Sequence, residues 1–187
     1  MSNSSSFSVE IRADSVIVSG YVNAVERESR ILRDQTGEFV EKVRAGVFAD
    51  AIDRVESVGL MFNHVRAIGD TDSCLELKED AIGLHATALI TDPEIIEKAK
   101  ANALRGWSFG FYPLEESWGM TDTGKRLRTL EKIDLFEVSI LDCTPAYIAT
   151  SIEARNLDKA EYRQYSEFNG YKLDLLRRQI EILTLKN

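Results

Sequence analysis

The chain has 187 residues, and its 31 acidic and 23 basic side chains give it a formal net charge of −8. An acidic balance argues against nucleic acid as the main partner, because phosphate binding needs clustered Lys and Arg. No apolar run approaches the roughly 20 residues that span a bilayer, so no membrane contact is expected. The two cysteines, Cys74 and Cys143, have no metal-like spacing, so neither a metal nor a cofactor is expected.

The N-terminal third combines a polar start with an alternating strand. Met1–Ser6 are small and polar, without the pattern of a secretory signal, and residues 1–14 are predicted as a flexible tail. Apolar or small residues at every second position from Val16 to Val22 predict a strand. Charged and turn-forming residues from Glu26 to Gly37 predict an exposed loop.

The middle of the chain alternates helix and strand signals. Apolar residues at i, i+3, i+4 and i+7 from Phe48 to Val55 predict a short helix. Leu60–Phe62 read as a buried strand that runs into Asn63 and His64, and Gly83–Ile90 alternate as a second strand. A second helix is predicted with Asp92 as N-cap, Pro93 at its first position and Gly106 as its stop.

The region from Trp107 to Leu141 reads as β structure. Trp107–Tyr112 are aromatic and predict a strand, Glu115–Lys125 predict a long hairpin loop, and Arg126–Leu141 supply one or two further strands. Alternation in the last segment places Leu135, Glu137, Ser139 and Leu141 on one face. Five or six strands with two short helices predict a mainly β fold, a closed or nearly closed antiparallel barrel over residues 15–155.

The composition changes after about Asn156. Residues 156–187 are rich in charged residues and leucine, and Leu173, Leu176, Ile180 and Leu183 follow a 3-4-3 spacing. This spacing predicts a helical C-terminal tail, which either packs on the barrel or acts as a detachable or partner-binding segment.

His64 and Ser108 are the candidates for a general base and a nucleophile. The chain has two histidines; His64 ends an apolar strand, where a site could open, whereas His85 lies within an alternating strand. Ser108 lies beside Gly106 and Gly110, whose small size lets a substrate approach the backbone. The competing interpretations are structural ones: a core histidine and an ordinary strand serine.

Glu137 is the candidate for the group that orients the base. It lies on a largely apolar strand, where an unpaired buried carboxylate would be costly. The alternative for Glu137 is a charge at the rim of the barrel, paired with a surface arginine.

Six short blocks occur in an order that resembles the prohead protease family of tailed phages, whose fold is related to the herpesvirus assemblin proteases. The resemblance covers roughly residues 15–152. The blocks are Gly20-Tyr21-Val22, Glu41 to Phe48, Phe62-Asn63-His64, Gly83-Leu84, Trp107 to Phe111, and Leu135 to Ser139, with Pro145-Ala146-Tyr147 closing.

The resemblance implies a serine endopeptidase with an assemblin-like barrel. It places the nucleophile on Ser108, the histidine on His64 and the acidic member on Glu137, with Asp142 as second choice; the role is not carried over to His85. The implied substrates are the scaffold, the N-terminal segment of the major capsid protein, and the protease itself. The implied location is the assembling procapsid in the host cytoplasm, and residues after about Asn156 would be a propeptide or targeting segment. The resemblance leaves open a homodimer or an assembly-dependent oligomer.

Two other functions are compatible with the sequence. A catalytically silent capsid-assembly scaffolding protein could keep the same barrel and act through its amphipathic tail. A cysteine hydrolase could pair Cys143 with His64, although the sequence around Cys143 lacks the basic residues that lower a thiol pKa. Inactivation by iodoacetamide would distinguish a cysteine hydrolase from a serine protease.

Overall fold

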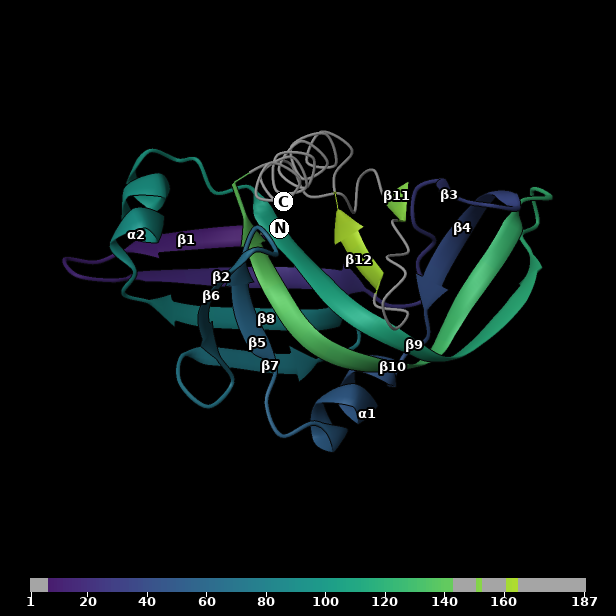
Figure 1. Cartoon of the computed structure of the whole chain (residues 1–187), viewed down its shortest axis with the longest axis horizontal. Coiled ribbons are helices and arrows are strands. Elements are labelled where there is room, and N and C mark those ends of the chain that lie inside the picture. Colours follow the sequence, from purple (N-terminus) through teal and green to yellow (C-terminus); the bar gives the residue numbers. More distant parts are fainter. Residues whose placement is uncertain (1–6, 143–150, 153–160, 165–187) are drawn as a thin grey trace, which may run out of the picture.

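The computed structural model describes residues 7–142, 151–152 and 161–164. These residues form a four-stranded sheet, an eight-stranded sheet and two short helices (Figure 1). The mainly β prediction with two helices is confirmed. The prediction of a closed or nearly closed antiparallel barrel is wrong, because the two sheets share no strand pairing and neither closes on itself.

The four-stranded sheet is antiparallel, in the order β1-β2-β8-β7. Its strands are β1 (Phe7–Ile11), β2 (Val16–Ala24), β8 (Gly83–Ile90) and β7 (Leu75–Glu79). The alternation in β2 and β8 buries one side of each strand, and the strand predictions for both segments are confirmed. The predicted N-terminal tail is wrong for Phe7–Ile11, because β1 pairs with β2 along its whole length.

The larger sheet is built around a long hairpin. Its strands are β11 (Ser151–Ile152), β12 (Glu161–Gln164), β9 (Gly106–Met120), β10 (Arg126–Leu141), β4 (Gly37–Val43), β3 (Leu32–Asp34), β5 (Gly59–Phe62) and β6 (Arg66–Asp70). One edge of β10 pairs antiparallel with β9. The other edge pairs in parallel with β4 near the start of β10 and with β5 near its end.

Three segments differ from the sequence predictions. Glu115–Lys125 are not a long loop, because β9 continues to Met120 and the turn is short. The predicted loop at Glu26–Gly37 contains β3, whose Leu32 is fully buried. Residues 161–164 lie in the predicted helical tail but form the strand β12. The rest of the 156–187 tail lies outside the described residues.

Both helices occur where the sequence predicts them. They are α1 (Val47–Arg54) and α2 (Pro93–Lys100). The Asp92 side chain caps α2 by accepting a hydrogen bond from the backbone N–H of Ile95 at 3.1 Å. The helix ends at Lys100, so Gly106 is not its stop but the first residue of β9. No helix among the described residues is long and apolar enough to cross a membrane.

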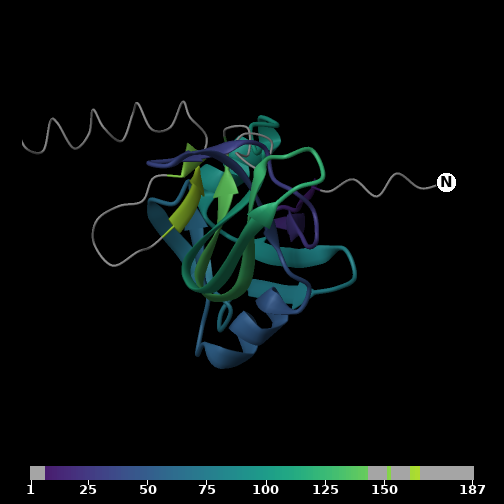
Figure 2. The ribbon, with the colours of Figure 1, turned by 90° about the vertical axis from the view of Figure 1, so that its right-hand side faces the viewer.

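The core lies between the sheets and α1. Phe109 and Phe111 of β9 are fully buried and stack with ring centroids 5.3 Å apart. Phe48 of α1 meets Phe109 edge-on at 5.4 Å. Figure 2 shows α1 beneath the curved β9–β10 hairpin, which is the position that this contact requires. One face of β9 is therefore fixed in the core, and its other face is available for polar residues.

A buried charge cluster holds β10 to β4 near the outer end of the hairpin. Arg128 donates to Glu41 at 3.1 Å and to Glu116 at 2.7 Å, and Glu41 is fully buried. We expect Arg128→Met to lower the free energy of unfolding by about 3–5 kcal/mol, because it removes a guanidinium from a buried carboxylate. Urea denaturation measures this loss.

Arg126 provides the matched control on the same strand. Both arginines lie over the Trp118 ring, but the ion pair of Arg126 with Asp34 is long, at 3.4 Å, and partly exposed. We expect Arg126→Met to cost at most about 1 kcal/mol. Equal losses in the free energy of unfolding for Arg128→Met and Arg126→Met would show that the burial of Glu41 does not determine the loss.

Candidate active site

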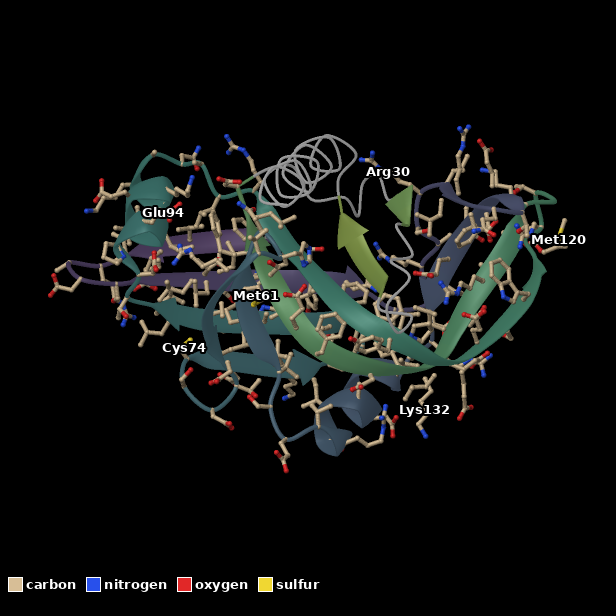
Figure 3. All side chains as sticks on the ribbon, in the orientation of Figure 1. Arg30, Met61, Cys74, Glu94, Met120 and Lys132 are labelled. Carbon is tan, nitrogen blue, oxygen red and sulfur yellow. The ribbon has the colours of Figure 1, made fainter. Side chains whose placement is uncertain are left out.

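Three adjacent strands place polar residues on one face of the larger sheet. Met61 of β5, Ser139 of β10 and Ser108 of β9 are register partners, and Glu137 lies two residues before Ser139. Directly opposite residues point to the same face, as do residues two apart on a strand. Ser108, Glu137 and Ser139 therefore share a face. Met61 marks this region near the centre of the molecule in Figure 3.

A β-bulge sets the direction of Glu137. The register shifts between Leu135 and Glu137, so Phe136 is an extra residue, and Glu137 lies opposite Gly110. A Cβ on Gly110 would lie 2.7 Å from Phe136 Cζ and 2.8 Å from Glu137 Cγ. The absence of a side chain at Gly110 thus makes room for both residues. Leu135 pairs with Phe111 on the core face, so the prediction that Leu135 shares a face with Glu137 is wrong.

His64 lies against Glu137 in a buried pair. Its Nδ1 contacts Oε1 of Glu137, and the side chains are only 2% and 5% exposed. An ionised carboxylate only accepts hydrogen bonds, so with Glu137 ionised the ring proton lies on Nδ1 and Nε2 is left with the free lone pair. Glu137 is therefore not a rim charge paired with a surface arginine.

The turn that carries His64 has an unusual backbone. Asn63 and His64 both have positive φ, 52° and 58°, which is uncommon for residues other than glycine. Two contacts with β10 hold this conformation: the Asn63 N–H donates to the Ile140 carbonyl at 2.9 Å, and the His64 N–H donates to Ser139 Oγ at 2.8 Å. Such strain persists where the surroundings over-determine it, as at binding and catalytic sites.

Asp142, the second choice for the acidic member, contacts other residues. Its carboxylate accepts from Asn63 Nδ2 at 2.9 Å and from Lys98 Nζ at 2.8 Å. Burial acts to raise the pKa of Asp142, but these hydrogen bonds outweigh it and leave that pKa below its ordinary value. A lowered pKa in the folded state gives stability that is present above the ordinary pKa and is lost as the pH falls. Asp142 thus anchors the turn through Asn63, and Glu137 is the carboxylate that contacts His64.

Ser139 is a site residue that the sequence reasoning did not single out. It is fully buried, it is the register partner of Ser108, and it holds the backbone of His64. Ser139 lies two residues after Glu137 on an alternating strand, and this spacing could have indicated that the two side chains share a face. Its hydrogen bond to His64 depends on pairing between β5 and β10, which are more than 70 residues apart in sequence and carry no local signal.

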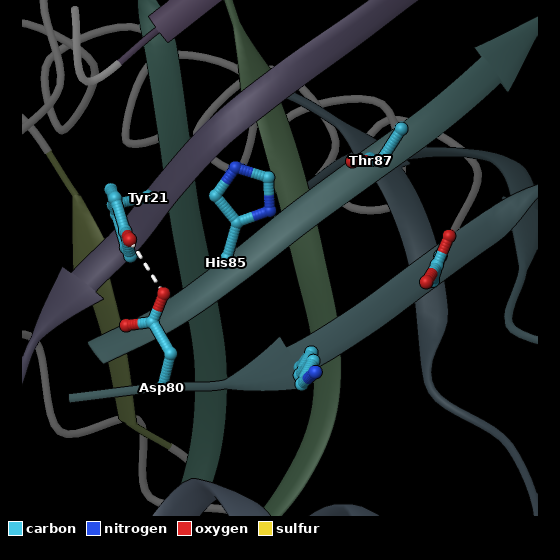
Figure 4. A pocket seen from close by; sticks show the side chains of 6 residues that line it. Tyr21, Asp80, His85 and Thr87 are labelled. Carbon is cyan, nitrogen blue, oxygen red and sulfur yellow. Dashed lines mark hydrogen bonds between the residues drawn. The ribbon is translucent and has the colours of Figure 1, made fainter. Parts of the chain in front are cut away.

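His85 lies elsewhere, on the outer side of the four-stranded sheet. It lines an open pocket with Tyr21, Asp80, Thr87 and two further residues, Glu76 and Lys78 (Figure 4). The Tyr21 hydroxyl donates to Asp80 at 2.6 Å, and this hydrogen bond raises the pKa of Tyr21. His85 Nε2 lies 3.4 Å from Ser19 Oγ. Ser19, Tyr21 and Asp80, three residues near His85, lie apart from the His64–Glu137 face.

No group of three His, Cys, Asp or Glu side chains in the described part of the chain is arranged to hold a metal ion. Cys143, the nucleophile of the alternative cysteine hydrolase, lies outside the described residues.

Comparison with protein families identifies the class of this chain. A family model described as caudovirus prohead serine protease matches residues 5–165, which is most of the chain. A match of this extent indicates a chain of the serine peptidase class. The chain belongs to the caudovirus prohead serine protease family, which assigns it a role in capsid maturation in the assembling procapsid, with capsid proteins as the implied substrates. No curated protein and no solved structure is detectably similar to it.

Proposed function

We propose that this chain is a serine endopeptidase in which Ser108 is the nucleophile, His64 the general base and Glu137 the group that orients the base. The observation that carries the proposal is the buried His64–Glu137 contact on the face that Ser108 shares, in a chain of a serine protease family. A serine hydroxyl becomes an effective nucleophile when a base takes its proton and a third group fixes the base.

The reaction is acyl transfer. His64 Nε2 takes the proton of Ser108 Oγ as that oxygen attacks the peptide carbonyl, and Glu137 stabilises the imidazolium that forms. Collapse of the tetrahedral intermediate breaks the C–N bond, and His64 gives its proton to the leaving amine. Water, deprotonated by His64, then hydrolyses the acyl-enzyme and restores Ser108. Backbone N–H groups beside Ser108 are the donors that we propose for the oxyanion.

The substrates that we propose are the scaffold, the N-terminal segment of the major capsid protein, and the protease itself. Membership of a prohead protease family supports this choice. The proposed place of action is the procapsid as it assembles in the host cytoplasm.

Co-expression with the coat and scaffold proteins of the same phage tests the function. We expect truncated coat or scaffold, read by intact mass, with the wild type and with Ser117→Ala, and none with Ser108→Ala. Ser117 is a matched control, because it lies on β9 but is exposed, and its hydroxyl donates to the exposed side of the hairpin, to Glu131 at 2.9 Å. Equal processing by Ser108→Ala would remove Ser108 from the mechanism. Normal shells without any processing would favour the silent scaffolding protein.

A further inference from the structure

The strand that carries Ser108 has two edges, and the chain itself pairs with both. One edge of β9 pairs with β10 from Gly106 to Met120. On the other edge, β12 is the strand that pairs with β9 in the part of the chain that the structure describes, through Glu161 opposite Phe111 and Tyr162 opposite Gly110. Figure 1 shows β12 alongside β9, on the side away from β10.

The pairing with β12 lies next to the proposed active site. Gly110 faces Tyr162 across one edge of β9 and Glu137 across the other. The two strands are antiparallel, so the chain from Glu161 to Gln164 runs toward Ser108. The same register, extended by two positions, would set Gln164 opposite Ser108.

We propose that the enzyme binds an extended peptide along this edge of β9, at Gly110 and Phe111, and that residues 161–164 of the same chain occupy the edge in this structure. This inference rests on the proposed function. One strand edge can pair with one strand at a time, so β12 and a substrate segment compete for the same backbone groups. The partner is therefore an extended segment of polypeptide bound antiparallel to β9, recognised first through its main chain.

The pairing between β12 and β9 is short, as expected for a contact that another strand can displace. The pairing between β12 and β9 covers two register positions, whereas β10 pairs with β9 throughout its length. The other edge of β12 pairs with β11, through Ser151 opposite Gln164 and Ile152 opposite Arg163. The chain thus presents β9 with a short strand that a longer extended segment can replace.

The test uses the full chain with Tyr162→Pro, compared with Tyr162→Val. Proline lacks the backbone N–H and is poorly accepted in a paired strand, whereas valine is a strong strand former. Hydrogen exchange at Gly110 and Phe111, measured in the Ser108→Ala background, reports the pairing of the edge. Labelling of Ser108 by a fluorophosphonate reports access to the nucleophile.

We expect Tyr162→Pro to raise both rates by about tenfold, the change that one or two net hydrogen bonds produce, and Tyr162→Val to change neither. A synthetic peptide of residues 158–167, added in trans to Tyr162→Pro in the Ser108→Ala background, should restore protection at Gly110 and Phe111. A scrambled peptide of the same composition should not. Glu161→Pro provides an independent variant if Tyr162→Pro does not fold.

Unchanged exchange at Gly110 and Phe111 in both proline variants would overturn the pairing. Faster exchange with unchanged labelling would overturn the competition between β12 and substrate. A total lack of labelling in every variant, with faster exchange in the proline variants, would instead count against Ser108 as the nucleophile.

Discussion

Glu137→Gln is expected to lower the rate of cleavage by about 10⁴-fold, the loss seen when the orienting acid of a serine protease loses its charge. The carboxylate of Glu137 contacts Nδ1 of His64 in a buried pair. An amide carries no charge to stabilise the imidazolium, and its NH₂ group can face Nδ1 and favour the wrong tautomer. The rate is measured as truncation of the coat or scaffold over time in co-expression, and as labelling of Ser108 by a fluorophosphonate.

Asp142→Asn is the matched control for this experiment. Asp142 contacts Asn63 and Lys98, and an amide can keep the hydrogen bond with Asn63. We expect its rate to stay within about fivefold of the wild type, since loss of a partly exposed ion pair costs at most about 1 kcal/mol. A larger loss with Asp142→Asn than with Glu137→Gln would transfer the orienting role to Asp142.

Gly110→Ala is expected to reduce both stability and activity. The added methyl group would lie within 2.8 Å of Phe136 Cζ and Glu137 Cγ, so the bulge must open and move Glu137. Overpacking of this kind costs about 1–3 kcal/mol in the free energy of unfolding. A displacement of the catalytic groups by about 1 Å can cost about 10²-fold in rate. Urea denaturation and fluorophosphonate labelling measure the two effects.

Gly119→Ala, on the same strand, controls for the loss of a glycine. Its added Cβ would meet no atom within 4 Å, so we expect a change of at most about 0.5 kcal/mol and an unchanged labelling rate. If Gly110→Ala kept wild-type activity, the bulge would tolerate a side chain opposite it, and Gly110 would not position Glu137.

The sequence predicted the local elements of the site better than their arrangement. Aromatic composition found the strand that carries Ser108, and alternation found the strand that carries Glu137. The capping signal at Asp92 found the start of α2. These features depend on neighbours in sequence. The structure places His64 and Glu137 in contact, while the catalytic roles of His64, Ser108 and Glu137 stay predictions.

The features that the sequence did not predict depend on contacts between residues that are distant in sequence. The bulge at Phe136 reverses the face of every later residue relative to Leu135, and simple alternation cannot reveal it. The parallel pairing of β10 with β4 and β5 and the separation of the sheets have no local signal, so a barrel was predicted instead. β12 was missed because a short strand in a charged segment carries little periodicity.

The position of β10 in the chain also determines when the proposed site can form. β4 and β5 are made early, yet both pair with β10, and the turn that holds His64 is anchored on Ser139 and Ile140. A nascent chain that has not reached Leu141 can therefore hold neither the histidine nor its carboxylate in place. Pairings over such sequence separations form slowly. The site that we propose therefore forms only after β10 has been synthesised and has paired with β5.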